Sequence, residues 1–561
     1  MKKSLQVLLA FVLFALVFTL VAVPVGAKPS KTIEVQILAL NDFHGNLLPP
    51  GGSAGRVGTI DAGGVEYLAT HVNNLRALNP NTVVVSAGDM IGASPLLSAL
   101  FHDEPTIEAF NLIGLDFNAV GNHEFDEGID ELLRMQKGGC HPVDGCLDGD
   151  DFEGADFSFL AANVVWKKNF KPIFAPYKIR TFNGVKIAFI GMTLEGTPSI
   201  VTPSGISELK FLDEAKTVNA LVPYLKRKGI ETIVVLIHEG GVQNPISSGI
   251  NECVGISGPI VDIVNNLNDE VDVVISGHTH QPYNCVIDNK IVTSAFSFGR
   301  LVTKVDLTID KRTRDVVTMV ADNRIVTRDV PKDTLLTDLI AKYQAIAAPL
   351  ENRIIGSITA DITRTTNAAG ESPLGDVIAD AQLDATNDPG FGDAVVAFMN
   401  PGGIRADFTY AGSPAGEGDG NVTYGEMFTV QPFGNSLVTM TLTGAQIDTL
   451  LEQQFVGCAQ TDRDRILQVS AGFTYSWSLS APACEKVDPV TIMINEVPID
   501  LAASYRVTVN SFLADGGDRF SVLVEGTDRL GGDVDTDALE KYFVANSPVP
   551  PGPQDRITQV P

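Results

Sequence analysis

The chain has 561 residues, of which 44% are hydrophobic and 7% aromatic, and it carries a formal net charge of −28. This length is too great for one hydrophobic core, and the composition is too apolar for a disordered protein, so we expect about two to four globular domains. The strong negative charge disfavours binding to nucleic-acid polymers and anionic membranes.

Residues 1–27 have the features of a signal peptide. Lys2 and Lys3 precede an apolar stretch over 7–23, and small residues at 25–27 form a cleavage site. Because the apolar stretch approaches the roughly 18 residues that can span a bilayer, an uncleaved anchor is the alternative. We predict an exported protein that is secreted, periplasmic or held at the cell surface, without membrane insertion after cleavage.

Apolar runs of strand length alternate with amphipathic stretches in residues 28–330. Helical spacing occurs over 64–78 and 107–113. This alternation predicts an α/β domain with layered sheets and helices. The expected strands cover 33–40, 82–86, 185–190, 232–237 and 271–275.

Five fragments with metal-binding side chains follow these runs, and they contain five of the eight histidines in the chain. In open α/β sheets, such strand ends deliver side chains into one crevice. We therefore predict one hydrolytic metal site made from all five. The fragments are Asp42-Phe43-His44, Gly88-Asp89, Gly121-Asn122-His123-Glu124, His238-Glu239 and Gly277-His278-Thr279-His280.

The residue types predict a site for two divalent ions. Asp89 would bridge them, and mixed carboxylate, amide and imidazole ligation favours Mn, Zn, Fe or Co. Two ions about 3.5–4 Å apart would acidify a bridging water and clamp the oxygens of a transferring phosphoryl group. The first ion would be bound by Asp42, His44 and His280, and the second by Asn122, His238 and His278.

Six cysteines in an exported chain predict disulfides, although a structural zinc site is the rival interpretation. The acidic segment 144–156 suggests either a solvated loop, which we favour, or a calcium site. Pairing neighbours in sequence gives Cys140 with Cys146, Cys253 with Cys285, and Cys458 with Cys484.

The pattern changes after residue 330. Residues 331–353 predict a helical linker, because apolar residues over 332–350 recur at helical spacing. A second domain is expected over 354–561, with a helix over 374–386 followed by hairpin-like strands. Three of its Gly-rich turns carry polar or aromatic residues, which permits close approach of a ligand. They are Asn400 to Arg405, Gln431 to Asn435, and Phe512 to Asp518.

The fragments around Asp42, Asp89, Asn122 and His278 resemble the motifs of calcineurin-like metallophosphoesterases, specifically the two-domain 5'-nucleotidase family. The resemblance covers nearly the whole mature chain. It implies a four-layer α/β/β/α metallophosphoesterase domain followed by a C-terminal α+β 5'-nucleotidase domain.

The same resemblance implies roles for further residues. His123 would face the substrate phosphate rather than a metal, oriented by Asp126. The base would lie between Phe433 and Phe512. The remaining substrate contacts would come from Asn400, Asn435, Asp518 and the phosphate-binding Arg405.

One departure from the family concerns the arginines that usually precede the first helix of the second domain. Residues 368–372 have none, and Arg364 lies a few residues upstream. Arg364 therefore either contacts the phosphate through a longer loop or is a solvated loop residue.

The sequence thus predicts a hydrolase that releases phosphate from nucleoside 5'-monophosphates and acts on other nucleotides, including UDP-sugars. The rivals are a 2',3'-cyclic nucleotide phosphodiesterase/3'-nucleotidase, a thiohydrolase, and a non-catalytic extracellular binding protein. The sequence leaves the oligomeric state open.

Overall fold

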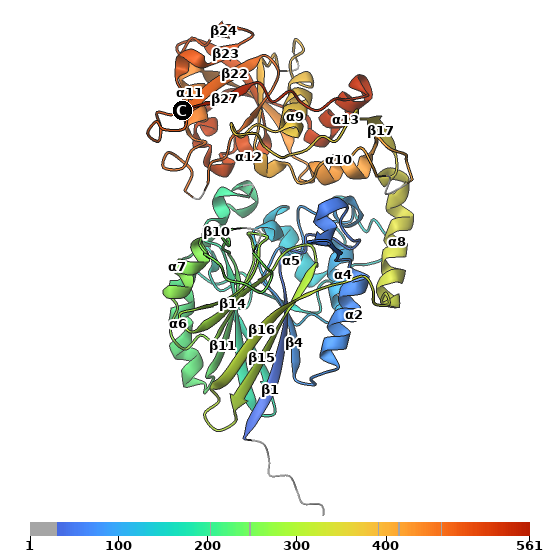
Figure 1. The fold of residues 1–561 in the computed structure, drawn as a ribbon, viewed down its shortest axis with the longest axis vertical. Helices are drawn as coiled ribbons and strands as arrows, with labels where there is room; N and C mark the ends of the chain where they lie inside the picture. The colour runs from blue at the N-terminus through green and yellow to red at the C-terminus, as the bar shows by residue number, and fades with distance from the viewer. Residues whose placement is uncertain (1–30, 202, 246–247, 391, 413–415, 462) are drawn as a thin grey trace, which may run out of the picture.

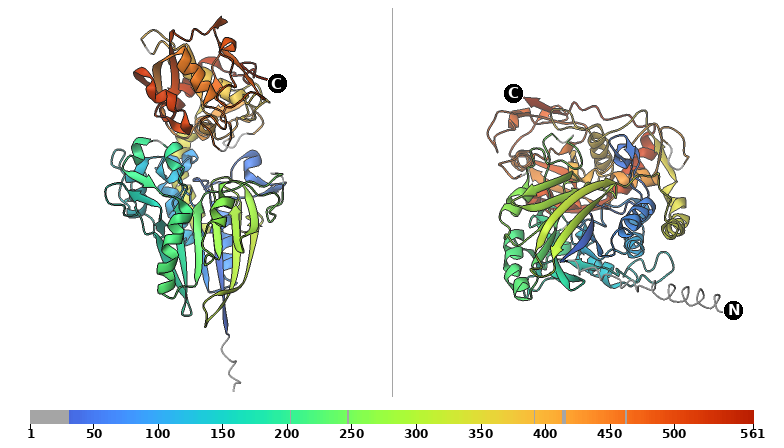
Figure 2. Two further views of the ribbon diagram at one scale, coloured as in Figure 1. Left: turned by 90° about the vertical axis from the view of Figure 1, so that its left-hand side faces the viewer. Right: turned by 60° about the horizontal axis from the view of Figure 1, so that its bottom comes forward.

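The computed structural model describes residues 31–561 except 202, 246–247, 391, 413–415 and 462, so the predicted signal peptide lies outside the described residues. The described chain forms two domains stacked along the long axis of the molecule (Figure 1, Figure 2). Helix α8 (Thr334–Glu351) runs along one flank of the first domain and ends beside the second. None of the described helices is long and apolar enough to cross a membrane.

The first domain contains two six-stranded sheets. The predicted strand 82–86 is confirmed residue for residue, and the other four are confirmed with ends shifted by a few residues. In order across the first sheet, the strands are β16 (Val316–Ile325), β15 (Leu301–Asp310), β1 (Thr32–Leu40), β4 (Thr82–Ser86), β5 (Phe117–Ala119) and β6 (Ser158–Leu160). The second sheet contains β13 (Pro282–Ile287), β14 (Lys290–Ala295), β12 (Val273–Ser276), β11 (Thr232–His238), β9 (Val185–Thr193) and β8 (Tyr177–Phe182).

Alternating side chains explain why these sheets form the two inner layers. In β1, Val35 and Ile37 belong to a core shared with the second sheet, whereas Leu38 and Leu40 belong to the core beneath the helices. The predicted four-layer α/β/β/α arrangement is therefore confirmed. The outer helices are α2 (Val65–Arg76), α3 (Leu96–Ala99), α4 (Glu104–Ile113) and α5 (Gly128–Lys137) on the first sheet, and α6 (Glu214–Arg227) and α7 (Pro259–Asn265) on the second.

The strand directions decide where the site forms. Strands β1, β4, β5 and β6 pair in parallel, and so do β9, β11, β12 and β14. Their carboxyl ends therefore meet at one edge of the domain. Strand β1 runs upward in Figure 1, so this edge faces the second domain.

The second domain has a five-stranded and a four-stranded sheet with helices packed around them. The first consists of β21 (Gln468–Val469), β18 (Val396–Met399), β25 (Ser504–Asn510), β20 (Ser436–Thr443) and β26 (Thr527–Val534), and the other of β24 (Val497–Pro498), β23 (Met493–Ile494), β22 (Phe473–Ser478) and β27 (Ile557–Val560). A ribbon of β17 (Ile354–Ser357) and β19 (Asn421–Thr423) precedes α10. The helices are α9 (Pro373–Asp384), α10 (Tyr424–Val430), α11 (Gly444–Glu452), α12 (Ser511–Ala514) and α13 (Asp535–Asn546).

Helix α8 confirms the predicted linker helix, while the exact domain boundaries stay a prediction. The Asp333 side chain caps its first turn by accepting hydrogen bonds from the backbone N–H groups of Leu335 and Leu336. Its buried residues, among them Leu336 and Tyr343, pack into the helical core of the first domain. The helix is thus fixed to the first domain along one face.

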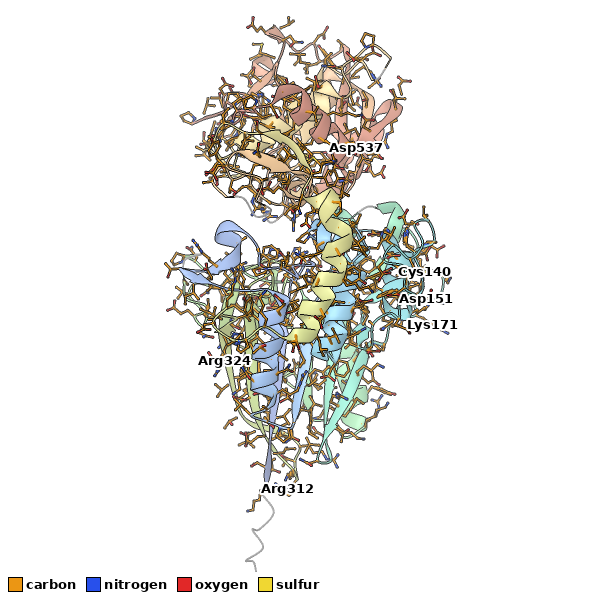
Figure 3. The ribbon with its side chains drawn as sticks, turned by 90° about the vertical axis from the view of Figure 1, so that its right-hand side faces the viewer. Cys140, Asp151, Lys171, Arg312, Arg324 and Asp537 are labelled. Carbon is orange, nitrogen blue, oxygen red and sulfur yellow. A yellow bond between two sulfur atoms is a disulfide. The ribbon has the colours of Figure 1, made fainter. Side chains whose placement is uncertain are left out.

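All three predicted disulfides are present, Cys140–Cys146, Cys253–Cys285 and Cys458–Cys484. Cys140 and Asp151 lie on the flank of the first domain beside α8 (Figure 3). The acidic segment 144–156 is a largely exposed loop, as predicted, but one of its carboxylates is covered. The side chain of Asp148 is only 3% exposed, because Lys342 and Tyr343 of α8 bind its carboxylate.

Candidate active site

The predicted metal ligands all lie at the edge where the parallel strands end. Asp42, Asp89 and Asn122 follow β1, β4 and β5, while His238 ends β11 and His278 follows β12. Five of the seven adopt left-handed backbone angles, which cost about 1–3 kcal/mol each and persist only where the surrounding structure holds them. These five are Asp42, His44, Asp89, His278 and His280, with φ between 49° and 69°.

The seven side chains form two groups with Asp89 between them. His44 Nε2 lies 3.1 Å from His280 Nε2, and His280 Nε2 lies 3.2 Å from Asp42 Oδ1. In the second group, Asp89 Oδ2 is 2.8 Å from His238 Nε2. His278 Nδ1 lies 3.1 Å from Asn122 Oδ1. Asp89 Oδ2 also lies 3.7 Å from His44 Nε2, which places this carboxylate between the groups.

The hydrogen bonds of two histidines fit metal binding. His44 Nδ1 lies 2.8 Å from the carbonyl oxygen of Gly92, and His238 Nδ1 lies 2.8 Å from that of Ala87. A carbonyl at Nδ1 requires the proton there and leaves the Nε2 lone pair directed into the site. His238 Nε2 is buried and makes no hydrogen bond in suitable geometry. The donor set therefore fits two divalent ions.

Electrostatics separate His238 from the neutral histidines His44 and His278. Burial lowers the pKa of His44 well below its usual value and that of His278 to about 3, so both imidazoles are neutral. Burial would also lower the pKa of His238, but Asp89 raises it to about 10. A positive charge is thus favoured between His238 and Asp89, supplied by a proton or by a metal ion.

His123 and Asp126 form a dyad beside these groups. His123 Nδ1 lies 2.8 Å from Asp126 Oδ2, and the backbone N–H of His123 donates to Asp89 Oδ1 at 2.9 Å. Burial alone would lower the pKa of His123, but the carboxylates of Asp126 and Asp89 raise it. An imidazolium is therefore stabilised next to the metal-binding groups, where it can donate to a phosphoryl or leaving-group oxygen.

The sequence indicates no role for Glu124, but in the structure this residue lies against the loops that carry Asp89 and Asn122. This buried carboxylate accepts hydrogen bonds from the backbone N–H groups of Asp89, Met90 and Gly121 at 2.9, 2.9 and 2.6 Å. It joins the loops after β4 and β5, so it positions Asp89, which lies between the two groups. Nothing in the sequence signals this role, because backbone donors leave no trace in side-chain identity.

Two residues of the second domain reach the dyad. The ring of Phe433 stacks on that of His123 with centroids 5.8 Å apart and an interplanar angle of 18°. The guanidinium of Arg405 lies 5.7 Å from the Phe433 centroid. Burial lowers the pKa of Arg405, whereas Asp126 and Asp89 raise it, so the guanidinium lies within reach of their charges.

Arg364 lies next to Arg405. Its Nη1 donates to the Arg405 carbonyl at 2.6 Å, and its backbone N–H donates to Asp407 Oδ1 at 2.8 Å. The Arg364 side chain is half exposed. The structure therefore brings two arginines together on the side of the second domain that faces the metal-binding groups.

The other predicted substrate residues make their contacts within the second domain. Asn400 Nδ2 donates to Asp518 Oδ2 at 2.8 Å, and Asn435 Oδ1 accepts from Ser511 Oγ at 3.2 Å. Phe512 packs directly on Gly517, where an added Cβ would lie 2.5 Å from the ring. Within the described residues, Phe433 and Phe512 make no ring contact with each other.

Comparison with known proteins identifies the family. Calcineurin-like phosphoesterase domains match residues 35–282, and the 5'-nucleotidase C-terminal domain matches 354–525. Endonuclease YhcR of Bacillus subtilis is 32% identical over 87% of this chain, which spans only 37% of YhcR. Cell wall protein Lmo0130 of Listeria monocytogenes is 32% identical over 92% of this chain and 67% of its own length.

A solved structure agrees with these matches. The 5'-nucleotidase precursor from Thermus thermophilus is 26% identical and superposes with a TM-score of 0.75, covering 94% of this chain and 99% of that one. Calcineurin-like phosphoesterases depend on metal ions, and the residue groups described above could bind them. The chain therefore belongs to the two-domain metallophosphoesterase/5'-nucleotidase family and is a phosphoester hydrolase.

Proposed function

We propose that this protein is an exported enzyme that uses two divalent ions to release phosphate from nucleoside 5'-monophosphates, and that it also accepts other nucleotides such as UDP-sugars. The single observation that carries the proposal is the contact between Phe433 and His123. It sets an aromatic surface suited to a base beside a dyad suited to phosphoryl transfer. A substrate between the two domains would touch both.

The proposed ligands are Asp42, His44, Asp89 and His280 for one ion and Asp89, Asn122, His238 and His278 for the other. Bound there, the ions would polarise the phosphoryl group and lower the pKa of an attacking water.

Side chains of the protein would bind the phosphate and the base and would transfer the proton. Arg405, with Arg364 beside it, would bind phosphate oxygens through its planar donors. Protonated His123, held by Asp126, would stabilise charge on the leaving oxygen and transfer a proton to it. Phe433 would stack on the base, with Phe512 on its other face, and Asn400, Asn435 and Asp518 would hydrogen-bond the nucleoside. This last set requires Asn400 and Asp518 to exchange their mutual hydrogen bond for bonds to substrate.

Export is supported by indirect observations. The three disulfides are typical of proteins from oxidising compartments. One relative is named a cell wall protein. A globular chain with a net charge of −28 suits a secreted or surface-held enzyme that binds small nucleotides rather than polymers.

The name of the relative YhcR raises endonuclease activity as a second candidate. This chain spans 37% of that protein, so the name describes a much longer molecule. Cyclic nucleotides, 3'-nucleotides and thiosulfonate-type substrates remain the rivals within the superfamily.

A phosphate-release screen tests the proposal. The purified full chain would be assayed with Mn²⁺, Zn²⁺, Co²⁺ or Fe²⁺ on AMP, 3'-AMP, 2',3'-cyclic AMP, UDP-glucose, p-nitrophenyl phosphate and single-stranded DNA. We expect kcat/KM for AMP to exceed that for 3'-AMP and the cyclic nucleotide by about 10-fold or more. Equal rates on every ester, or cleavage of DNA alone, would contradict the proposal.

A further inference from the structure

Two histidines outside the active site stack on each other. The rings of His102 and His141 have centroids 3.8 Å apart and an interplanar angle of 17°. His102 follows α3, and His141 lies in the loop closed by the Cys140–Cys146 disulfide. The carboxylates of Glu127 and Asp144 lie within hydrogen-bond distance of the pair.

One carboxylate oxygen lies near a nitrogen of each ring. Asp144 Oδ2 is 2.9 Å from His102 Nε2 and 3.2 Å from His141 Nδ1. The backbone N–H of Asp144 donates to the lone pair of the same His141 Nδ1 at 3.2 Å, so an ion bound at this nitrogen would replace that hydrogen bond. Two imidazole nitrogens thus lie close to one carboxylate oxygen, and two imidazoles with a carboxylate are the donor set of many zinc sites.

The second ring nitrogen of His102 is held as in metal sites. His102 Nδ1 lies 2.8 Å from Glu127 Oε2. A carboxylate at this nitrogen retains the proton there, as in carboxylate–histidine–zinc triads, so an ion that displaced the Nε2 proton now shared with Asp144 would meet the Nε2 lone pair. His44 and His238 of the active site have the same arrangement, with a carbonyl in place of the carboxylate.

The surroundings hold the cluster in place and are acidic. The disulfide closes the loop that contains His141 and Asp144, and Asp148 anchors the following residues to Lys342 of α8. Burial alone would lower the pKa of His102, but its hydrogen bonds to Glu127 and Asp144 raise it to about 9. The same negative charges would attract a divalent cation.

We propose that His102, His141 and Asp144 bind one further divalent ion of the zinc class, separate from the active-site pair, with Glu127 orienting His102. Each nitrogen coordinates an ion in the plane of its own ring, so binding would draw the two rings out of their parallel stack. Glu127 directly follows Asp126. The ion would therefore tie the disulfide loop to the segment that orients His123.

The cluster also borders the dyad in space. A cavity of about 20 Å³ is lined by His102 and Glu127 on one side and by His123 and Asp126 on the other. This volume is enough for a single water molecule. His102 and Glu127 therefore border the same small cavity as the His123–Asp126 dyad.

Metal stoichiometry tests this inference independently of any nucleotidase activity. The metal-free full chain would be dialysed against Zn²⁺, and the bound ions per chain would be measured by mass spectrometry. In an Asp89→Asn background, which weakens the active-site pair, we expect one tightly bound ion to remain. His102→Ala or His141→Ala in that background should remove it.

Two further variants keep the test decisive. His71→Ala is the matched control, because His71 Nε2 contacts the Thr327 carbonyl at 3.0 Å and takes no part in the cluster. It should leave the remaining ion in place. Asp144→Asn preserves size at the partly exposed loop and should weaken Zn²⁺ binding by about 10-fold or more even if the histidine variants fail to fold. Unchanged ion content in Asp144→Asn and in the folded histidine variants would overturn the proposal.

Discussion

The two halves of the candidate active site differ in how far they are assembled. In the first domain, Asp42, Asp89 and His238 are fully buried and lie within a few ångströms of their neighbours. In the second domain, Asn400, Asn435, Phe512 and Asp518 contact other residues of that domain, whereas Phe433 and Arg405 approach the dyad. The candidate metal centre is therefore built by strand pairing within one domain, whereas the proposed nucleotide site depends on how two domains meet.

The largest effect is expected at the residue that joins the two ligand groups. Asp89→Asn removes the charge between His44 and His238, so we expect kcat to fall by about 10³-fold or more on AMP and p-nitrophenyl phosphate alike. Metal content and kinetics on both substrates would be measured, with the exposed Asp61→Asn as control. A loss confined to AMP would show that Asp89 serves substrate specificity instead.

Loss of the dyad should lower kcat by an amount that depends on the leaving group of the substrate. His123→Ala is expected to lower kcat on AMP by about 10²–10³-fold, because the departing ribose oxygen needs a proton. The loss on p-nitrophenyl phosphate should be much smaller, since p-nitrophenolate leaves without one. Equal losses on both substrates would assign His123 to phosphate binding rather than proton transfer.

Asp126→Asn tests the same dyad through pH. Asp126 raises the pKa of His123, so the protonated acid persists to higher pH in the native protein and is lost as pH rises through that pKa. Without this carboxylate the pKa falls. The alkaline limb of the kcat profile for AMP should therefore move to lower pH, and an unmoved limb would argue against His123 as the acid.

Substitutions in the second domain should lower activity on nucleotides and leave activity on simple esters nearly unchanged. Phe433→Ala and Phe512→Ala are each expected to lower kcat/KM for AMP by about 10- to 100-fold through lost stacking. Activity on p-nitrophenyl phosphate should stay within a few-fold, as in the control Phe170→Ala, whose ring is 62% exposed. Because Phe512 packs on Gly517 here, an effect at Phe433 alone would mean that the base uses one ring only.

The contrast between the two domains also explains which parts of the site could be predicted from the sequence. Asp42 and His278 were identified because strand direction brings residues at strand ends to one edge, whatever the details of packing. Glu124 was missed because most of its partners are backbone N–H groups, which every sequence offers. The stacking of Phe433 on His123 could not be predicted, because it depends on the relative placement of two domains rather than on any local pattern.

The smallest effect is expected at Arg364. This arginine lies upstream of residues 368–372, where we noted that arginines are missing. Its side chain is half exposed and donates to the Arg405 carbonyl, so solvent screens its charge. Arg364→Ala should raise KM for AMP by about 3- to 10-fold and leave kcat nearly unchanged, since it would bind ground state and transition state equally. Arg312→Ala, at the far end of the first domain in Figure 3, is the matched control. If the two variants behave alike, Arg405 is the phosphate-binding arginine and Arg364 only supports its loop.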